Sequence, residues 1–160
     1  MQDHNERMNG YIQAMKNSGL SGYIQVCDIS GLTENELLDA IKKLFKTQQK
    51  KTTAAITVSD QTAMFLSNIF SSLKIKIPDN VSLAGFDDSF YAAYMQPPLT
   101  TAIQPVTEMA AKAGQLIGDL LLLLQPIKKS IYEFKCQPVI RSSIADLTIN
   151  PAKKNKKRKK

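Results

Sequence analysis

Apolar runs of strand length alternate along this chain with segments whose apolar residues recur every three or four positions. The continuous apolar run at 53–58 is typical of a strand that is covered on both faces, the run at 81–86 predicts another buried strand, and 22–26 predicts a short strand. The helical periodicity predicts helices at 6–18, from Thr33 onward, at 61–73 and at 106–124. This alternation predicts an α/β fold, in which helices on both faces of a largely parallel sheet form three layers.

Two further observations complete the expected framework. Thr33 and Glu36 have the three-residue spacing of a capping box, which fixes where the second helix begins. Shorter extended segments follow the third long strand, and we expect them at 100–103, 131–135 and 139–141.

Carboxylates follow each of the three long strand-like runs, at Asp28, at Asp60 and at the pair Asp87 and Asp88. In a parallel sheet the carboxyl ends of the strands share one edge, where ligands bind. Carboxylates there can accept hydrogen bonds from a polyhydroxylated ligand or hold Mg²⁺. The structural alternative is helix capping, which we favour for Asp60, or turn formation, which stays open for Asp87 and Asp88.

Composition excludes several classes of site. The chain of 160 residues has two cysteines, Cys27 and Cys136, and one histidine, His4, so a zinc site is not expected and the cysteines are expected to be buried. The glycines form no phosphate-binding loop, and no nucleophile is paired with a base, so we expect neither a cofactor nor an enzyme.

Charge is concentrated at one end. Seven of the 21 basic residues lie within 153–160, which leaves 14 basic and 14 acidic residues in 1–152. The net charge of +7 therefore belongs to a tail that is expected to be disordered, and not to a folded surface. The longest apolar run, at 120–124, is too short to span a membrane, and the polar start lacks a secretory signal, so we expect a cytoplasmic protein.

Several motifs in a fixed order resemble the LacI/GalR family of bacterial transcription regulators. RMNGYIQAMKNSGL resembles the segment that opens the first helix of that family's second lobe. IPDNVSLAGFDD, PPLTT and the later Gln-Pro resemble the strand, turn and helix that follow, and VIRSSI resembles the closing strand. The resemblance covers about residues 5–146.

The resemblance implies a two-lobed fold of the type I periplasmic-binding-protein kind, of which this chain holds mostly the second lobe. Residues 1–147 would be a partial effector-binding domain, and residues 148–160 the disordered basic tail. Within the domain, 1–103 would form the second lobe, 104–130 a helix normally packed on the first lobe, and 131–147 the closing strands. We expect this chain to lack the DNA-binding helix-turn-helix domain.

The same resemblance implies an effector site. Arg7 and Asp87 match residues of the family that contact the effector, and Ser59 stands where the family usually has an asparagine. Asp28 and Ile29 lie where another residue of the pocket usually comes from. The implied function is non-enzymatic: this segment senses a sugar or nucleobase effector and dimerises, and the parent protein then changes its affinity for DNA.

Two alternatives remain open. One is a sugar-binding protein of the same fold, and the other is a magnesium-dependent phosphoryl-transfer enzyme that uses Asp28, Asp60 and Asp87. Independently of these, the helix at 106–124 has apolar positions that the first lobe would cover in the family. We expect that helix to support self-association or to fold back, because several exposed leucine-sized side chains are costly.

Overall fold

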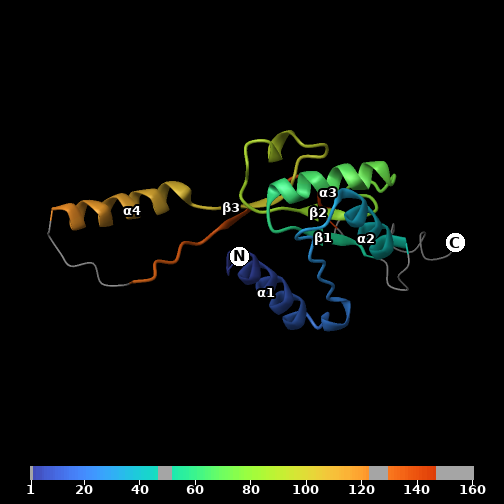
Figure 1. Cartoon of the computed structure of the whole chain (residues 1–160), viewed down its shortest axis with the longest axis horizontal. Helices are drawn as coiled ribbons and strands as arrows, with labels where there is room; N and C mark the ends of the chain where they lie inside the picture. Colours follow the sequence, from blue (N-terminus) through green and yellow to red (C-terminus); the bar gives the residue numbers. More distant parts are fainter. Residues whose placement is uncertain (1, 47–51, 123–129, 147–160) are drawn as a thin grey trace.

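The computed structural model describes residues 2–46, 52–122 and 130–146 as an α/β arrangement (Figure 1). Its helices, 3₁₀ helices (η) and strands follow one another as α1 (Gln2–Asn17), η1 (Ser21–Tyr23), α2 (Glu34–Lys46), β1 (Ala54–Ile56), α3 (Asp60–Ser72), β2 (Ser82–Ala84), η2 (Ala92–Tyr94), β3 (Thr101–Ile103), α4 (Val106–Leu121) and β4 (Gln137–Val139). The predicted basic tail at 148–160 lies outside these described residues.

The strands line up in the order β1, β2, β3, β4. β1 and β2 are parallel, with Ala54 opposite Ser82. Two parallel bridges, Ala84 to Thr100 and Asp87 to Ile103, join β2 to the β3 segment, and β4 runs antiparallel to β3. In Figure 1, α3 lies above the strands and α1 below them. The predicted α/β class with a largely parallel sheet is confirmed.

The predicted start of α2 is formed by local hydrogen bonds. At α2 the Thr33 N–H donates to Glu36 Oε2 at 2.8 Å, and the Glu36 N–H donates to Thr33 Oγ1 at 3.4 Å, which completes the capping box. The hydroxyl and N–H of Thr33 hold the pKa of Glu36 below its usual value, because they stabilise the charged carboxylate.

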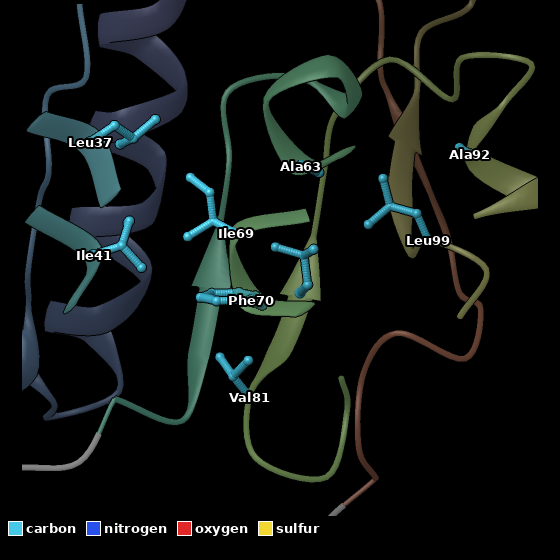
Figure 2. Packing of buried hydrophobic residues seen from close by; sticks show 9 residues of the cluster. Leu37, Ile41, Ala63, Ile69, Phe70, Val81, Ala92 and Leu99 are labelled. Carbon is cyan, nitrogen blue, oxygen red and sulfur yellow. The ribbon is translucent and has the colours of Figure 1, made fainter. Parts of the chain in front are cut away.

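The hydrophobic core lies where α2 and α3 meet the first strands. Phe70 of α3 is fully buried and meets Phe45 of α2 edge to face, with ring centroids 5.0 Å apart. Figure 2 shows Phe70 at the centre of the cluster, which also contains Leu37, Ile41, Ala63, Ile69, Val81, Leu83, Ala92 and Leu99. Apolar contacts among α2, α3 and β2 therefore hold the two helices against the strands and fix where the strands end.

Two of the strand predictions, at 22–26 and 131–135, are wrong. The segment 22–26 begins as η1, where the Tyr23 N–H bonds to the Leu20 carbonyl and the Ile24 N–H to the Ser21 carbonyl. These local bonds take the place of a strand ladder, and Val26 stays exposed. Residues 131–135 also form no strand, because β4 pairs with β3 only at 137–139.

One burial prediction is also wrong. The run at 53–58 was expected to be covered on both faces, yet Ile56 at the end of β1 is 65% exposed. Periodicity identifies the strand, but the burial of each face depends on what packs against it. In the part of the chain that the structure describes, the Ile56 side of β1 stays open.

The segment after β4 is anchored to the centre of the sheet. Ser143 is buried, its hydroxyl donates to the Leu83 carbonyl at 2.6 Å, and it accepts the Thr100 N–H at 2.7 Å. The Leu83 N–H in turn donates to the Ser143 carbonyl at 2.8 Å. This part of the predicted closing segment therefore fixes β2 and the start of β3 together.

α4 extends away from the sheet, and none of its residues is buried (Figure 1). Apolar side chains that are exposed along it include Val106, Met109, Ile117, Leu120 and Leu121. Lys112 of α4 contacts the returning chain, with its Nζ 4.7 Å from the ring centroid of Tyr132. Among the described residues, no helix has the length and apolar character needed to cross a membrane.

Removing the Phe70 ring tests the assignment of the core. Because this side chain is fully buried, we expect Phe70→Ala to lower the free energy of unfolding by about 3–5 kcal/mol. Urea denaturation followed by circular dichroism measures the change. Phe90→Ala is the matched control, since Phe90 is 84% exposed and its loss should change stability little. Equal effects of the two substitutions would contradict this core.

Candidate functional site

Arg7 connects α1 to the carboxyl ends of β1 and β2. Its Nη1 donates to the carbonyl of Val58, just beyond β1, and its Nη2 lies 3.7 Å from Asp87 Oδ1, just beyond β2. The guanidinium also lies 4.0 Å from the centroid of the Phe86 ring, in a cation–π contact. The predicted residues Arg7 and Asp87 therefore meet at the sheet edge where α/β folds bind ligands.

Asp87 is also held by a residue that the sequence analysis did not single out. Gln104 Nε2 donates to Asp87 Oδ1 at 2.7 Å. Gln104 directly follows β3, so it reaches the same edge of the sheet as Asp87. The signal was present in the sequence, because a polar residue after a strand-like run has the same pattern as the aspartates.

Ser59 is placed beside this group and caps α3. Its Oγ accepts the Thr62 N–H at 3.2 Å and lies 3.0 Å from Thr62 Oγ1. Ser59 is partly exposed and directly follows Val58, whose carbonyl accepts the Arg7 hydrogen bond. The Ser59 hydroxyl is therefore engaged with its own helix.

Asp60 does not cap α3, which corrects the favoured interpretation. It is the first residue of the helix and is fully buried. Its Oδ2 accepts the Ser89 N–H at 2.7 Å, and its Oδ1 accepts the Thr101 hydroxyl at 2.6 Å. The carboxylate thus joins the helix to the turn after β2 and to β3. Local spacing could not reveal this role, since both partners are distant in sequence.

Asp87 and Asp88 are adjacent, yet they have different partners. Asp88 Oδ1 lies 2.7 Å from Arg141 Nη2, and Arg141 Nη1 also donates to the Leu99 carbonyl at 2.8 Å. Asp88 is thereby bound to the segment after β4, and only Asp87 of the pair meets Arg7. Their φ angles of 113° and 51° form the tight turn that separates the two side chains.

The remaining predicted pocket residues are not joined to this group. Asp28 is exposed, and its Oδ1 accepts the Ser30 N–H at 2.9 Å. That backbone hydrogen bond holds the pKa of Asp28 below its usual value. Ile29 packs against the hydrophobic core. In the part of the chain with described structure, no hydrogen bond or ion pair links Asp28 to Arg7, Ser59 or Asp87.

The arrangement suits hydrogen bonding to a small ligand more than metal chemistry. Arg7 and Gln104 present donors and Asp87 presents acceptors, with side chains of Arg7 and Asp87 that are 24% and 33% exposed. No three His, Cys, Asp or Glu residues gather as metal ligands within 2–46, 52–122 and 130–146. Asp28, Asp60 and Asp87 therefore do not form the cluster that the magnesium alternative requires.

The prediction that the two cysteines are buried is wrong. Cys27 and Cys136 are both exposed.

Comparison with known proteins identifies a family model and curated repressors that are similar to this chain. Residues 1–144 match the family model described as "Periplasmic binding protein-like domain". The HTH-type transcriptional repressor PurR of Photobacterium profundum is 28% identical over 147 residues, which is 89% of this chain and 42% of that protein. The ribose operon repressor of Escherichia coli is 32% identical over 117 residues, which is 72% of this chain and 34% of that protein.

Solved structures also match. A LacI family transcriptional regulator from Lactobacillus casei with bound sucrose superposes with a TM-score of 0.62 and 25% identity, covering 84% of this chain and 49% of that one. This chain therefore spans about half the length of that regulator, and less than half of the two repressors.

Gly85 provides a test of the packing behind the site. A Cβ at this position would collide with the Asp60 carboxylate and lie 2.9 Å from Leu99 Cδ2. We expect Gly85→Ala to destabilise the fold by about 1–3 kcal/mol, because neither neighbour is free to move. Gly10→Ala is the control, since a Cβ there has open space within α1 and should be neutral or stabilising. Thermal unfolding of both variants measures the difference, and a stable Gly85→Ala variant would contradict the packing.

Proposed function

We propose that this chain, which belongs to the periplasmic binding protein-like domain family and to its branch of LacI-type transcription regulators, forms one wall of an effector site in such a regulator. The effector binds at the carboxyl ends of β1 and β2. Binding then shifts a conformational equilibrium in the parent protein and changes its affinity for DNA, which a domain outside this sequence contacts.

The arrangement of Arg7, Asp87 and Gln104 carries this proposal. Three polar side chains from α1, the turn after β2 and the residue after β3 converge at one edge of the sheet. Arg7 and Asp87 are oppositely charged and partly exposed, so together they offer donors and acceptors with little net charge. Such a pair suits an uncharged ligand that carries hydroxyl or amide groups, as sugars and nucleobases do.

The names of the similar proteins support the regulatory part. They include transcriptional repressors, and a regulator of the LacI family was solved with bound sucrose. The alternative is a sugar-binding protein of the same fold that has no role in regulation. This alternative is weaker, because the proteins similar to this chain include repressors. Against the magnesium-dependent enzyme, the described residues hold no cluster of metal ligands, and the two similar curated proteins named above are repressors.

Ligand-dependent thermal stability tests the effector site. We expect a member of a panel of ribose, sucrose, cellobiose, nucleosides and purines to raise the melting temperature of the chain. A ligand that binds only the folded state stabilises it by about 2.7 kcal/mol at one hundred times its Kd, which is about 5–11 °C for a chain of this size. Differential scanning fluorimetry measures the shift.

Matched variants connect the shift to the site. Arg7→Lys keeps the charge but loses the planar fork, and Asp87→Asn removes the negative charge, so each should abolish the shift. Asp79→Asn is the control, since Asp79 lies before β2, at the opposite end of that strand. A shift that survives both site substitutions would refute this location of the site, and a panel without any shift would refute binding of these ligands.

The exposed face of α4 supports a second part of the proposal, self-association of the chain. Ile117, Leu120 and Leu121 recur at helical spacing, and all three are exposed. Burying such side chains contributes about 1.5–3 kcal/mol each, which favours association through this helix.

Substitution on α4 tests this association. We expect Ile117→Glu to shift the chain from dimer toward monomer, because it places a charge on the apolar face. Sedimentation velocity measures the distribution, and Gln115→Glu supplies a charge at another exposed position of the same helix as control. A wild-type chain that is monomeric and binds no hydrophobic dye would contradict self-association.

A further inference from the structure

We infer that Asp60 and Thr101 are positioning residues of the effector site, which hold the turn at 87–89 so that Asp87 faces Arg7 and Gln104. This inference rests on the proposed function for its ligand-binding consequence. The sequence did not predict this role: Asp60 was interpreted mainly as a helix cap, with magnesium binding as the alternative, and Thr101 had no assigned role.

The backbone N–H groups of the turn show how it is held. The Asp87 N–H donates to the Ala102 carbonyl at 2.9 Å. The next N–H, of Asp88, donates to Thr101 Oγ1 at 3.3 Å, and that of Ser89 donates to Asp60 Oδ2 at 2.7 Å. Three consecutive donors therefore have fixed acceptors, and two of the acceptors are the side chains of Asp60 and Thr101.

The two side chains also hold each other. The Thr101 hydroxyl donates its hydrogen to Asp60 Oδ1 at 2.6 Å, which leaves its lone pairs free to accept from the Asp88 N–H. Removing the hydroxyl breaks both bonds at once. The pair thus acts as one unit between α3 and β3.

The turn requires such support because of its conformation. Asp87 and Asp88 have φ angles of 113° and 51°, a region that residues other than glycine rarely adopt. Conformations of this kind persist when the surrounding structure over-determines them, and they concentrate at ligand sites. Here the surrounding hydrogen bonds set the direction in which the Asp87 side chain leaves the backbone.

Burial separates the positioning role from direct ligand contact. Asp60 is 0% exposed and Thr101 is 3% exposed, whereas the Asp87 side chain is 33% exposed. Gly85 lies so close to the Asp60 carboxylate that no side chain fits between them. Asp60 and Thr101 are thus shielded from the ligand side, and their effect on binding passes through Asp87.

Hydrogen exchange tests the support without any ligand. In Thr101→Val we expect the amides of Asp88 and Ser89 to exchange at least about tenfold faster, the effect of losing one hydrogen bond of ordinary strength. Thr101→Ser keeps the hydroxyl and should retain protection. Thr100→Val is the matched control, because Thr100 is also buried but its hydroxyl bonds to the backbone of Arg141.

Two-dimensional NMR on the whole chain measures these rates, and Asp60→Asn provides a second variant should Thr101→Val fail to fold. An asparagine oxygen can still accept the Ser89 N–H, but its NH₂ group competes for the lone pairs of Thr101, so faster exchange is expected mainly at Asp88. Unchanged exchange at Asp88 in a folded variant of either kind would overturn the inference.

Binding of ribose and sucrose, measured by calorimetry, tests the consequence for the site. For the sugar that raises the melting temperature, we expect Thr101→Val to weaken binding about tenfold. Thr101→Ser keeps the hydroxyl and should bind that sugar as the wild-type chain does. Unchanged binding in a folded Thr101→Val variant would overturn the positioning role. If neither sugar binds the wild-type chain, the proposed function fails for these sugars, and the exchange experiment still decides the role of the pair.

Discussion

The carboxylate of Asp60 is the contact on which the geometry of the sheet edge depends. It is fully buried, and hydrogen bonds from Ser89 and Thr101 satisfy its two oxygens. A buried carboxylate without such partners would be costly, so the first turn of α3, the turn after β2 and the strand β3 must come together. The direction of Asp87 follows from that junction, which leaves Asp87 Oδ1 3.7 Å from Arg7 Nη2.

The polar groups of the site contribute little to holding the fold. Arg7 and Asp87 are partly exposed and 3.7 Å apart, and ion pairs of this kind are worth about 0–1 kcal/mol. Stability comes instead from the core around Phe70 and from buried bonds such as those of Ser143. The site side chains can therefore exchange their mutual contacts for contacts with a ligand while the sheet stays intact. This division is what a sensing surface requires.

Sequence periodicity predicted the long elements because their apolar stripes repeat locally, as in α2 with its capping box and in the strand that leads to Asp87. It failed at 22–26, where local 3₁₀ hydrogen bonds formed in place of a ladder. The pair of Arg7 and Asp87 was predicted from the family motifs and lies together. Asp60 could not be predicted in its role, because its partners are 29 and 41 residues away in sequence, and local spacing carries no information about them.

The chain also connects the site directly to α4. Gln104 binds Asp87, and its carbonyl accepts the Val106 N–H at 2.8 Å, where α4 begins. A single residue, Pro105, thus separates a side chain in the site from a helix whose apolar face is exposed. A ligand that competes for Asp87 changes the hydrogen bonding of Gln104 at the root of this helix. Suppose that the state with the apolar face of α4 buried in an association and the state with that face exposed differ in free energy by only a few kcal/mol. A ligand that binds the two states with different affinity then shifts the equilibrium between them. In the proposed function, the shortest route along the chain from effector binding to self-association would therefore run through Gln104.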